Sequence, residues 1–336
     1  MGIKSLTQLI KNKTDNSIHN KNIEEYHGKK IALDASLFIY QSLMNYRYNN
    51  DFIKNKEGNY ISHTLGIFNK LQNLMSHNII PVVIFDGKPP IEKTNVINAR
   101  KNIQKKAEEE LNNSDVTLSK SKIDLLKKKI IRITYEHIDE IKTLLNLMGV
   151  WWIHIDGEAE GIASELCRKG IVDYVMTEDM DSLVFETPKL IRKCVFKNVK
   201  NYEYSLFDLN EVLEKLNMNI NEFKDMCILM GCDYVQPIPR IGNITAYKLI
   251  KAHGSIENII KWNDVSKKYD IPSDYLETYK NALYLFNIFR DKLDENIITK
   301  PEIDIINLKK YLQDVFNFNE TKVNNTFNKL NIKLES

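Results

Sequence analysis

The chain has 336 residues, of which 43% are hydrophobic, and a formal net charge of +2 at pH 7. This composition is typical of an ordinary soluble protein that buries its core as one large domain or two fused ones. No run reaches the roughly 18 to 20 apolar residues of a membrane span, and the N-terminus lacks the apolar stretch of a secretory signal, so we expect neither membrane insertion nor secretion. The four cysteines form no CxxC pair, which favours reduced thiols in an intracellular protein over zinc sites or disulfides: Cys167, Cys194, Cys227 and Cys232.

Strand-like and helix-like segments alternate in the first part of the chain. In chain order the sequence predicts a strand at 29–33, helices at 35–46 and 62–77, a strand at 82–85, helical character over 91–148 with a polar break at 112–121, a strand at 150–155, a helix at 160–169, and strands at 172–176 and 190–195. Apolar strands separated by helices are typical of a mainly parallel sheet that is covered on both faces. The sequence therefore predicts an α/β core with a mainly parallel central sheet flanked by helices.

The strand signals fade after about Leu206, and short helices follow. Helical periodicity marks 208–216, 221–230, 243–253, 255–261, 274–289 and 308–316. No Gly/Ser-rich or Pro-rich linker intervenes, so the boundary is a soft one. We predict two regions, an α/β core over residues 1–206 and a helical C-terminal region over residues 207–336.

Acidic residues stand at the ends of the apolar runs. Asp34 ends KKIALD, Asp86 ends PVVIFD, and Asp179 follows VDYVMT. Any one of them is well explained as a helix cap or a turn residue, but their recurrence favours a shared site, because ligands of open parallel sheets bind at the carboxyl ends of the strands. The complete set of such acids is Asp34, Asp86, Glu158, Glu160, Asp179, Asp181 and Asp233.

These carboxylates predict a divalent-metal site. Gathered at one end of a sheet, they would repel one another and lose hydration, so a compensating positive charge is needed, and Mg²⁺ prefers oxygen ligands. Asp179 and Asp181 are two apart in what we expect to be an extended segment, so both can point to one side. Glu158 can precede a helix that Glu160 opens, where the helix dipole favours acids. Composition and spacing leave the substrate open.

A basic segment lies between Lys88 and Tyr135, with twelve Lys or Arg against six Asp or Glu. Most such runs are solvated helical faces. A surface that contacts phosphates becomes the better interpretation only if the chain acts on a polyanion.

Six sequence blocks, in order and spacing, resemble the flap endonucleases, which belong to the XPG-like group of structure-specific 5′ nucleases. The blocks are MGIKSL, IALDASLFIYQ, VVIFDGKPP, the Glu-Ala-Glu at 158–160, TEDMDSLVF and LMGCDYV. The resemblance extends from Met1 to about Leu330 and implies a PIN-like nuclease core. It also implies that all seven acids are ligands of two Mg²⁺ ions, for which Mn²⁺ can substitute.

The same resemblance assigns further residues. Lys93 and Arg100 match the catalytic basic pair of the family; they are seven apart, so we expect them two turns apart on one helix face. Tyr40 matches the aromatic residue on which the family stacks a base, although by spacing alone a helical tyrosine is usually a core residue. Arg47 is expected to contact DNA. The segment from about 91 to 132 matches the helical arch through which a single-stranded 5′ flap is threaded, which gives the basic excess a purpose.

The region from about 221 to 253 matches the helix–two-turn–helix with which the family holds duplex DNA. Here the chain reads PIPRIGNITAYKLIKAH, so Arg240 replaces the first glycine of the usual Gly-Ile-Gly turn. We expect Gly242 and Lys248 to contact the duplex backbone, and we do not expect the bound K⁺ of the family. No recognisable sliding-clamp peptide follows this region.

The resemblance implies a Mg²⁺-dependent DNA flap endonuclease, with 5′→3′ exonuclease activity, that acts in replication and repair. Two metals would activate a water and stabilise the departing 3′ oxygen. An exonuclease or Holliday-junction resolvase of the same group, a non-catalytic DNA-junction binding module and a phosphatase of small phosphates are the alternatives. The expected partner is DNA with 5′ flaps, nicks or junctions, bound by a monomer in the nucleus, or at a cytoplasmic site of DNA replication if the source is a virus.

Overall fold

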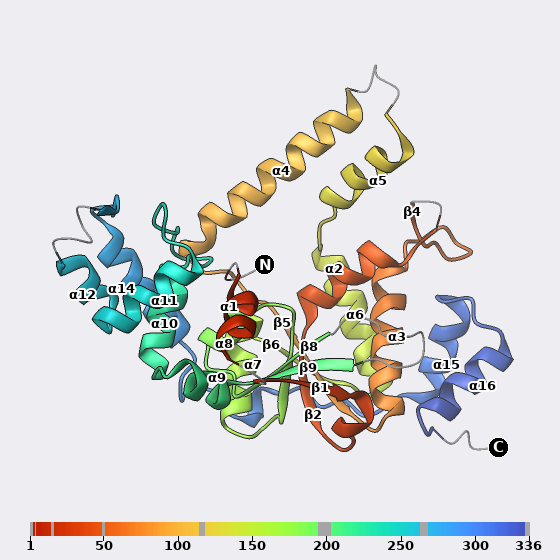
Figure 1. The fold of residues 1–336 in the computed structure, drawn as a ribbon. Coiled ribbons are helices and arrows are strands. Elements are labelled where there is room, and N and C mark those ends of the chain that lie inside the picture. Colours follow the sequence, from red (N-terminus) through yellow and green to blue (C-terminus); the bar gives the residue numbers. More distant parts are fainter. Residues whose placement is uncertain are drawn as a thin grey trace. The chain divides into compact units, whose positions relative to one another are not determined.

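The computed structural model (Figure 1) describes residue 3 and residues 5–14, 17–48, 51–113, 118–193, 203–262 and 268–332. The chain divides into two compact units. The first unit consists of Met1–Ala32, Gly87–Lys93 and Asp156–Ile297, and the second of Leu33–Asp86, Thr94–Ile155 and Ile298–Ser336. Both units interleave along the sequence, and the boundary expected after residue 206 stays a prediction.

The first unit contains strands from two parts of the chain, before residue 35 and between residues 174 and 208, and most of the helices of the C-terminal half. Its elements are α1 (Leu6–Lys13), β1 (Ile18–Asn22), η1 (Ile23–Tyr26), the start of β2 (Lys30–Asp34), η2 (Ile91–Lys93), α7 (Ala159–Arg168), β7 (Tyr174–Met176), α8 (Asp181–Val184), β8 (Lys189–Lys193), β9 (Glu203–Asp208), α9 (Leu209–Leu216), α10 (Ile220–Leu229), α11 (Asn243–His253), α12 (Ile256–Lys261), α14 (Tyr275–Phe286) and η3 (Glu295–Ile297).

The sheet of the first unit runs in the order β1-β9-β8-β7, followed by β2. Strand β7 pairs with β8 in parallel, whereas β9 pairs antiparallel with both β8 and β1. Apolar side chains of α1, α8, α9 and α10 form one buried cluster with Leu190 and Phe207 of the sheet. Burial of this apolar surface stabilises the unit and fixes α8 and α10.

The second unit begins with the last two residues of β2 and contains the long helices of the middle of the chain. Its elements are α2 (Ala35–Asn45), β3 (Arg47–Tyr48), β4 (Asp51–Phe52), α3 (Ser62–Ser76), β5 (Ile80–Phe85), α4 (Thr94–Asn112), α5 (Lys120–Lys129), α6 (Tyr135–Met148), β6 (Trp151–His154), α15 (Ile305–Asp314) and α16 (Glu320–Lys329). Strands β5 and β6 pair in parallel, and β3 and β4 form a small antiparallel hairpin. Helices α4 and α5 lie side by side and form a helical hairpin (Figure 1).

The predicted α/β class with a mostly parallel central sheet is confirmed, and most predicted elements recur within a few residues. Two predictions of local structure are wrong. Asp181 does not continue an extended segment with Asp179, because Met180 has helical backbone angles and Asp181 begins α8. Lys93 ends the short helix η2 and does not share α4 with Arg100.

Three of the four cysteines are described, and they are free thiols: Cys167, Cys227 and Cys232. Burial raises the pKa of each of these thiols. Cys194 lies outside the described residues. In the part of the chain that the structure describes, no helix is both long enough and apolar enough to cross a membrane.

Candidate active site

Five of the seven predicted acids belong to the first unit, and each stands where a helix begins or ends. Glu158 is the N-cap of α7, and Glu160 lies in the first turn of that helix. Asp179 follows β7, and Asp181 opens α8. Asp233 follows α10 after a short turn. Helix dipoles therefore favour the negative charges of Glu158, Glu160 and Asp181.

The start of α7 is held against an aromatic ring. Gly157 has φ +127°, and a Cβ built on it would lie 2.0 Å from the ring of Phe289. A Cβ on Gly161 would lie 2.8 Å from the same ring and 3.1 Å from Phe185. Only glycine fits at both positions, so the close contact with Phe289 fixes the turn that presents Glu158 and Glu160.

Backbone and phenol groups hold the carboxylates in place. The amide of Ile3 donates to Asp181 Oδ1 at 2.8 Å, and the amide of Asp181 donates to Asp179 Oδ1 at 3.0 Å. The hydroxyl of Tyr234 donates to Glu158. These bonds orient the acids, since charge-assisted hydrogen bonds to a buried carboxylate are among the strong ones.

Lys93 is the cation that these acids surround. Its Nζ pairs with Glu158, lies 3.4 Å from Asp233 Oδ2, and lies 5.5 Å from the centre of the Tyr234 ring. Burial by itself would lower the pKa of Lys93, but the charges of Glu158, Glu160 and Asp233 raise it above its ordinary value. The charge of Lys93 also acts on the two remaining acids of the unit, Asp179 and Asp181.

Burial and mutual repulsion act together on two of these carboxylates. Burial raises the pKa of Asp181 well above its usual range, and the charges of Asp179 and Asp233 raise it further. Burial likewise raises the pKa of Asp179, although the Asp181 amide opposes the shift. The site therefore carries crowded negative charge that attracts further cations.

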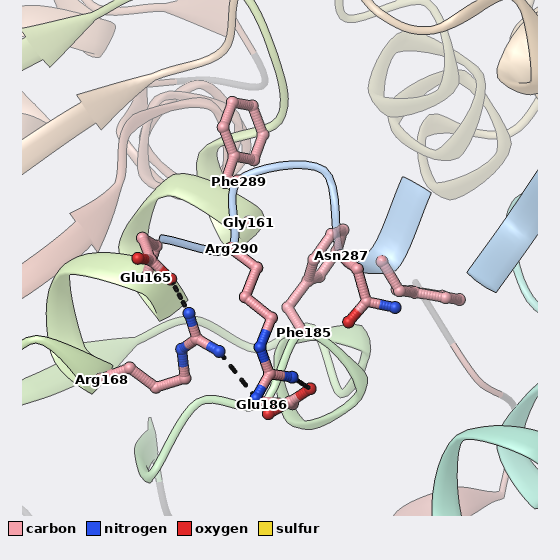
Figure 2. Close-up of a pocket in the computed structure, with 9 residues that line it drawn as sticks. Gly161, Glu165, Arg168, Phe185, Glu186, Asn287, Phe289 and Arg290 are labelled. Atoms are coloured by element: carbon pink, nitrogen blue, oxygen red, sulfur yellow. Dashed lines mark hydrogen bonds and ion pairs between the residues drawn. The ribbon is translucent and has the colours of Figure 1, made fainter. Parts of the chain in front are cut away.

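Behind α7 lies a second charged group, in the pocket that Figure 2 shows. Glu186 accepts a hydrogen bond from Arg290 at 2.6 Å and from Lys224 Nζ at 2.6 Å, and Arg168 lies 3.7 Å away. Lys224 is 2% exposed and also donates to Asn287 Oδ1 at 2.7 Å. This group ties α7 and the end of α8 to α10 and to the segment after α14, so it supports the helices that carry Glu160 and Asp181.

The other two predicted acids belong to the second unit. Asp34 ends β2, is 8% exposed, and caps α2 by accepting a hydrogen bond from the Leu37 amide at 3.1 Å. Asp86 follows β5, which is the neighbour of β2 in the sheet order. The end of β2 thus provides both a helix cap and a candidate metal ligand.

The remaining predicted residues occupy helices and turns of the two units. In the second unit, Tyr40 is half-buried on α2, Arg47 is at the start of β3, and Arg100 is exposed on α4. In the first unit, Gly242 is the N-cap of α11, and Lys248 is exposed on that helix.

Arg240, the departure from the usual glycine, has φ +69°, a left-handed conformation that glycine adopts without strain. Its guanidinium donates to the Lys268 carbonyl at 2.6 Å and lies over the ring of Tyr269. These contacts hold the non-glycine residue in this turn.

The donor set fits Mg²⁺ by its chemistry, because it consists of hard carboxylate oxygens, and burial and mutual repulsion raise the pKa of Asp181 among them. Among the residues that the structure describes, no group of three or more His, Cys, Asp or Glu side chains is arranged so that it could hold a metal ion. Lys93 pairs with two of the acids in this arrangement. A bound cation and Lys93 would compete for the same oxygens.

Sequence reasoning missed Tyr234 and Ile3. Tyr234 directly follows Asp233 in the LMGCDYV block, so its place in that block is a signal that could have drawn attention to it. The contribution of Ile3 is a backbone amide, and no residue pattern announces it.

Two family models match the chain: the XPG N-terminal domain matches residues 1–107, and the XPG I-region matches residues 149–233. The matched segments contain Lys93 and all seven predicted acids. The fold and the acid-lined site are therefore those of an XPG-like protein.

Relatives and solved structures narrow this class. Flap endonuclease 1 of Glycine max is 40% identical over 287 residues, which cover 85% of this chain and 74% of that protein. Flap endonuclease 1 of Schizosaccharomyces japonicus is 34% identical and covers 98% and 87% of the two chains. The structure of flap endonuclease-1 from Methanococcus jannaschii matches with a TM-score of 0.65 and 27% identity, covering 93% of this chain and 95% of that one. The chain belongs to the flap endonuclease family.

The fold is also that of a more distant protein. The catalytic core of Rad2 in complex with a DNA substrate matches with a TM-score of 0.70 at 21% identity, over 98% of this chain and all of that one. This likeness concerns the fold alone.

Proposed function

We propose that this protein is a Mg²⁺-dependent, structure-specific flap endonuclease that hydrolyses a DNA phosphodiester bond where a 5′ single strand leaves a duplex. The observation that carries the proposal is the cluster of five carboxylates around Lys93 in the first unit. Membership of the flap endonuclease family supports the choice of substrate. Members of this family are generally metal-dependent, in keeping with this cluster of carboxylates.

Glu158, Glu160, Asp179, Asp181 and Asp233 would hold the metal, with Asp34 and Asp86 of the second unit as the other proposed ligands. Mg²⁺ held by these residues would supply an activated water and would stabilise the departing 3′ oxygen. The chain's own groups orient these ligands: Tyr234 fixes Glu158, and the Ile3 amide fixes Asp181.

Besides pairing with the acids, Lys93 is a proposed contact to the scissile phosphate. Because its ammonium is charged and already lies among the acids, it can donate hydrogen bonds to the scissile phosphate when DNA enters. Arg100 is the proposed second contact to this phosphate. Tyr40 would stack on an unpaired base, and Arg47, Gly242 and Lys248 would contact the sugar-phosphate backbone. The hairpin of α4 and α5 would form the arch.

We further propose a 5′→3′ exonuclease activity, action as a monomer, and, by likeness to eukaryotic relatives, work in the nucleus during replication and repair. Two ions at the acid cluster, with Mn²⁺ as a substitute for Mg²⁺, are part of this proposal.

Mapping of the cleavage site on a labelled double-flap DNA with Mg²⁺ tests the function. We expect one main cut next to the junction, leaving a 5′-phosphate and a 3′-hydroxyl. Asp181→Ala should abolish this cut and still bind the flap DNA; near-normal turnover by that variant would sink the assignment.

Parallel reactions separate the alternatives. If a nicked duplex is hydrolysed faster than flap DNA, the protein is an exonuclease. If a four-way junction is hydrolysed faster than flap DNA, it is a resolvase. Binding without hydrolysis of any DNA indicates a junction-binding module. Preference for a chromogenic phosphate ester over flap DNA indicates a phosphatase.

A further inference from the structure

Asp124, on arch helix α5, is a carboxylate shared by two cations of the second unit. Its Oδ1 accepts a hydrogen bond from Arg47 NH1 at 3.3 Å, and its Oδ2 lies 2.7 Å from Lys128 Nζ. The hydrogen bond with Lys128 lowers the pKa of Asp124, and the charges of Lys128, Arg47 and Lys127 lower it further. Asp124 is therefore an anion among three cations.

Arg47 is fixed more firmly than the other cations. Its side chain is only 8% exposed, and its guanidinium lies 5.3 Å from the centre of the Phe52 ring, across the β3–β4 hairpin. An arginine held in this way keeps its fork of donors in one place, which is the arrangement that favours recognition of a dioxygen anion.

Other ion pairs of the α4–α5 hairpin look different. Lys122 pairs with Glu110 at 2.8 Å and Arg132 with Glu108 at 2.8 Å, and all four side chains are at least 40% exposed. Such pairs contribute little and exchange readily with water. At Asp124, by contrast, each oxygen of one carboxylate meets a separate cation, and one of these cations is nearly buried.

We propose that Arg47 and Lys128 form a binding site for one backbone phosphate of the nucleic-acid substrate, and that Asp124 masks this site in the free protein. A phosphodiester, like the carboxylate, offers one negative charge and two outward oxygens, so it fits between the same two cations when Asp124 does not occupy them. The inference rests on the proposed action on DNA. It assigns to Asp124 a role that opposes binding.

A purely structural role for Asp124 predicts the opposite sign. If the carboxylate only positions Arg47 and α5 for the substrate, its removal loosens both and weakens binding. If it masks a phosphate site, its removal exposes two cations and tightens binding. The direction of the change in affinity therefore separates the two roles.

The experiment measures binding of fluorescent DNA by anisotropy in EDTA, so that catalysis plays no part. Asp124→Asn keeps the shape of the side chain and removes its charge. Glu109→Gln is the matched control, because it removes the same charge from the arch while its pairing with Lys105, at 3.9 Å between exposed side chains, is weak. We expect Asp124→Asn to bind flap DNA about 3- to 10-fold more tightly than Glu109→Gln does.

The salt dependence should change as well. One additional phosphate contact makes the slope of log K against log salt steeper by about 0.7 for a single strand or about 0.9 for a duplex. The same titration with a single-stranded oligonucleotide and with a blunt duplex shows which part of the substrate supplies the phosphate. Equal affinity and equal slope for Asp124→Asn and Glu109→Gln, or weaker binding by Asp124→Asn, would overturn the proposal.

A second variant guards against an effect of misfolding. Lys128→Ala should change the affinity of the otherwise unchanged protein less than twofold, because Asp124 already engages Lys128, whereas it should cancel the gain in the Asp124→Asn background. Additive effects of the two substitutions contradict the masked site. Failure of the unchanged protein to cut flap DNA would instead count against the proposed function, so the two failures are distinguishable.

Discussion

Charged side chains gather in two regions of this chain and are arranged in opposite ways. Around Lys93, five carboxylates lie near one another and are partly or fully buried. On the α4–α5 hairpin, Glu108 and Glu110 each have a cationic partner, and the side chains are exposed. The first arrangement costs stability, as is usual for groups retained for a proposed catalytic role, while the second is nearly neutral to folding.

The strongest test of this contrast is Asp181→Asn. Loss of one proposed carboxylate ligand should reduce cleavage of flap DNA on the order of 10³-fold, the magnitude expected when a main electrostatic contact to a transition state is lost. In EDTA the same variant should melt at a higher temperature than the unchanged protein, because one of the crowded charges is gone. Single-turnover cleavage and thermal melting measure both effects, and a lower melting temperature contradicts the crowding.

Lys93→Ala tests the same contrast between the buried acid cluster and the exposed pairs of the α4–α5 hairpin by removing the cation of the cluster. Without the ammonium the acids repel one another, so in EDTA we expect the free energy of unfolding to fall by about 3 kcal/mol. Added Mg²⁺ should restore more stability to this variant than to the unchanged protein. Lys105→Ala is the control: its exposed side chain lies 3.9 Å from Glu109, so its loss should shift stability by less than about 0.5 kcal/mol.

Lys224→Met tests whether burial, and not distance, decides the strength of an ion pair. Lys224 is 2% exposed and lies 2.6 Å from Glu186, so we expect a loss of about 3 kcal/mol in urea unfolding. Lys309 pairs with Glu320 at the same 2.6 Å, but its side chain is 37% exposed. Lys309→Met should cost less than about 1 kcal/mol, and equal losses would refute the distinction.

Asp225 makes stability depend on pH. Burial raises the pKa of this carboxyl to about 6, although the Tyr279 hydroxyl and the Ile256 amide oppose the shift. The folded state therefore binds the proton more tightly than the unfolded state does, and the free energy of unfolding should fall by up to about 3 kcal/mol as pH rises from 4 to 6. Asp225→Asn should lose this part of the pH dependence in urea titrations, and an unchanged profile counts against it.

The smallest effect is expected on the arch. Glu110→Gln breaks the pair with Lys122 and should change the free energy of unfolding by less than about 0.5 kcal/mol. High salt should erase even this difference. A loss above about 1 kcal/mol in urea unfolding would show that the arch pairs resemble the buried ones after all.

Sequence predicted the strands whose residues are apolar, and with them the acids at their ends. β5 reads IPVVIF and is buried from its second residue onward, so Asp86 after it was easy to place. β1 reads IHNKN and offers no apolar pattern; it forms because β9 pairs with it, which is a tertiary effect. The sequence therefore predicts neither β1 nor β9.

Within the site, the sequence predicted the acids as candidate ligands but not how their side chains are oriented. The turn at Met180 that makes Asp181 the first residue of α8 depends on local backbone angles. The bond from Tyr234 to Glu158 joins residues 76 positions apart, so it could not be inferred without the fold. The resemblance to a family identifies the acids as candidate ligands, whereas the orientation of their side chains depends on the packing of the fold.

The contact of the Phe289 ring with Gly157 and Gly161 limits which substitutions these three positions can accept during evolution. A methyl group at position 161 would meet the ring at 2.8 Å, so alanine is excluded there while phenylalanine stays at 289. A smaller residue at 289 would make room for alanine at 161. It would not change the φ of +127° at Gly157, which residues other than glycine rarely adopt. Natural variants should therefore change positions 161 and 289 together and keep glycine at 157.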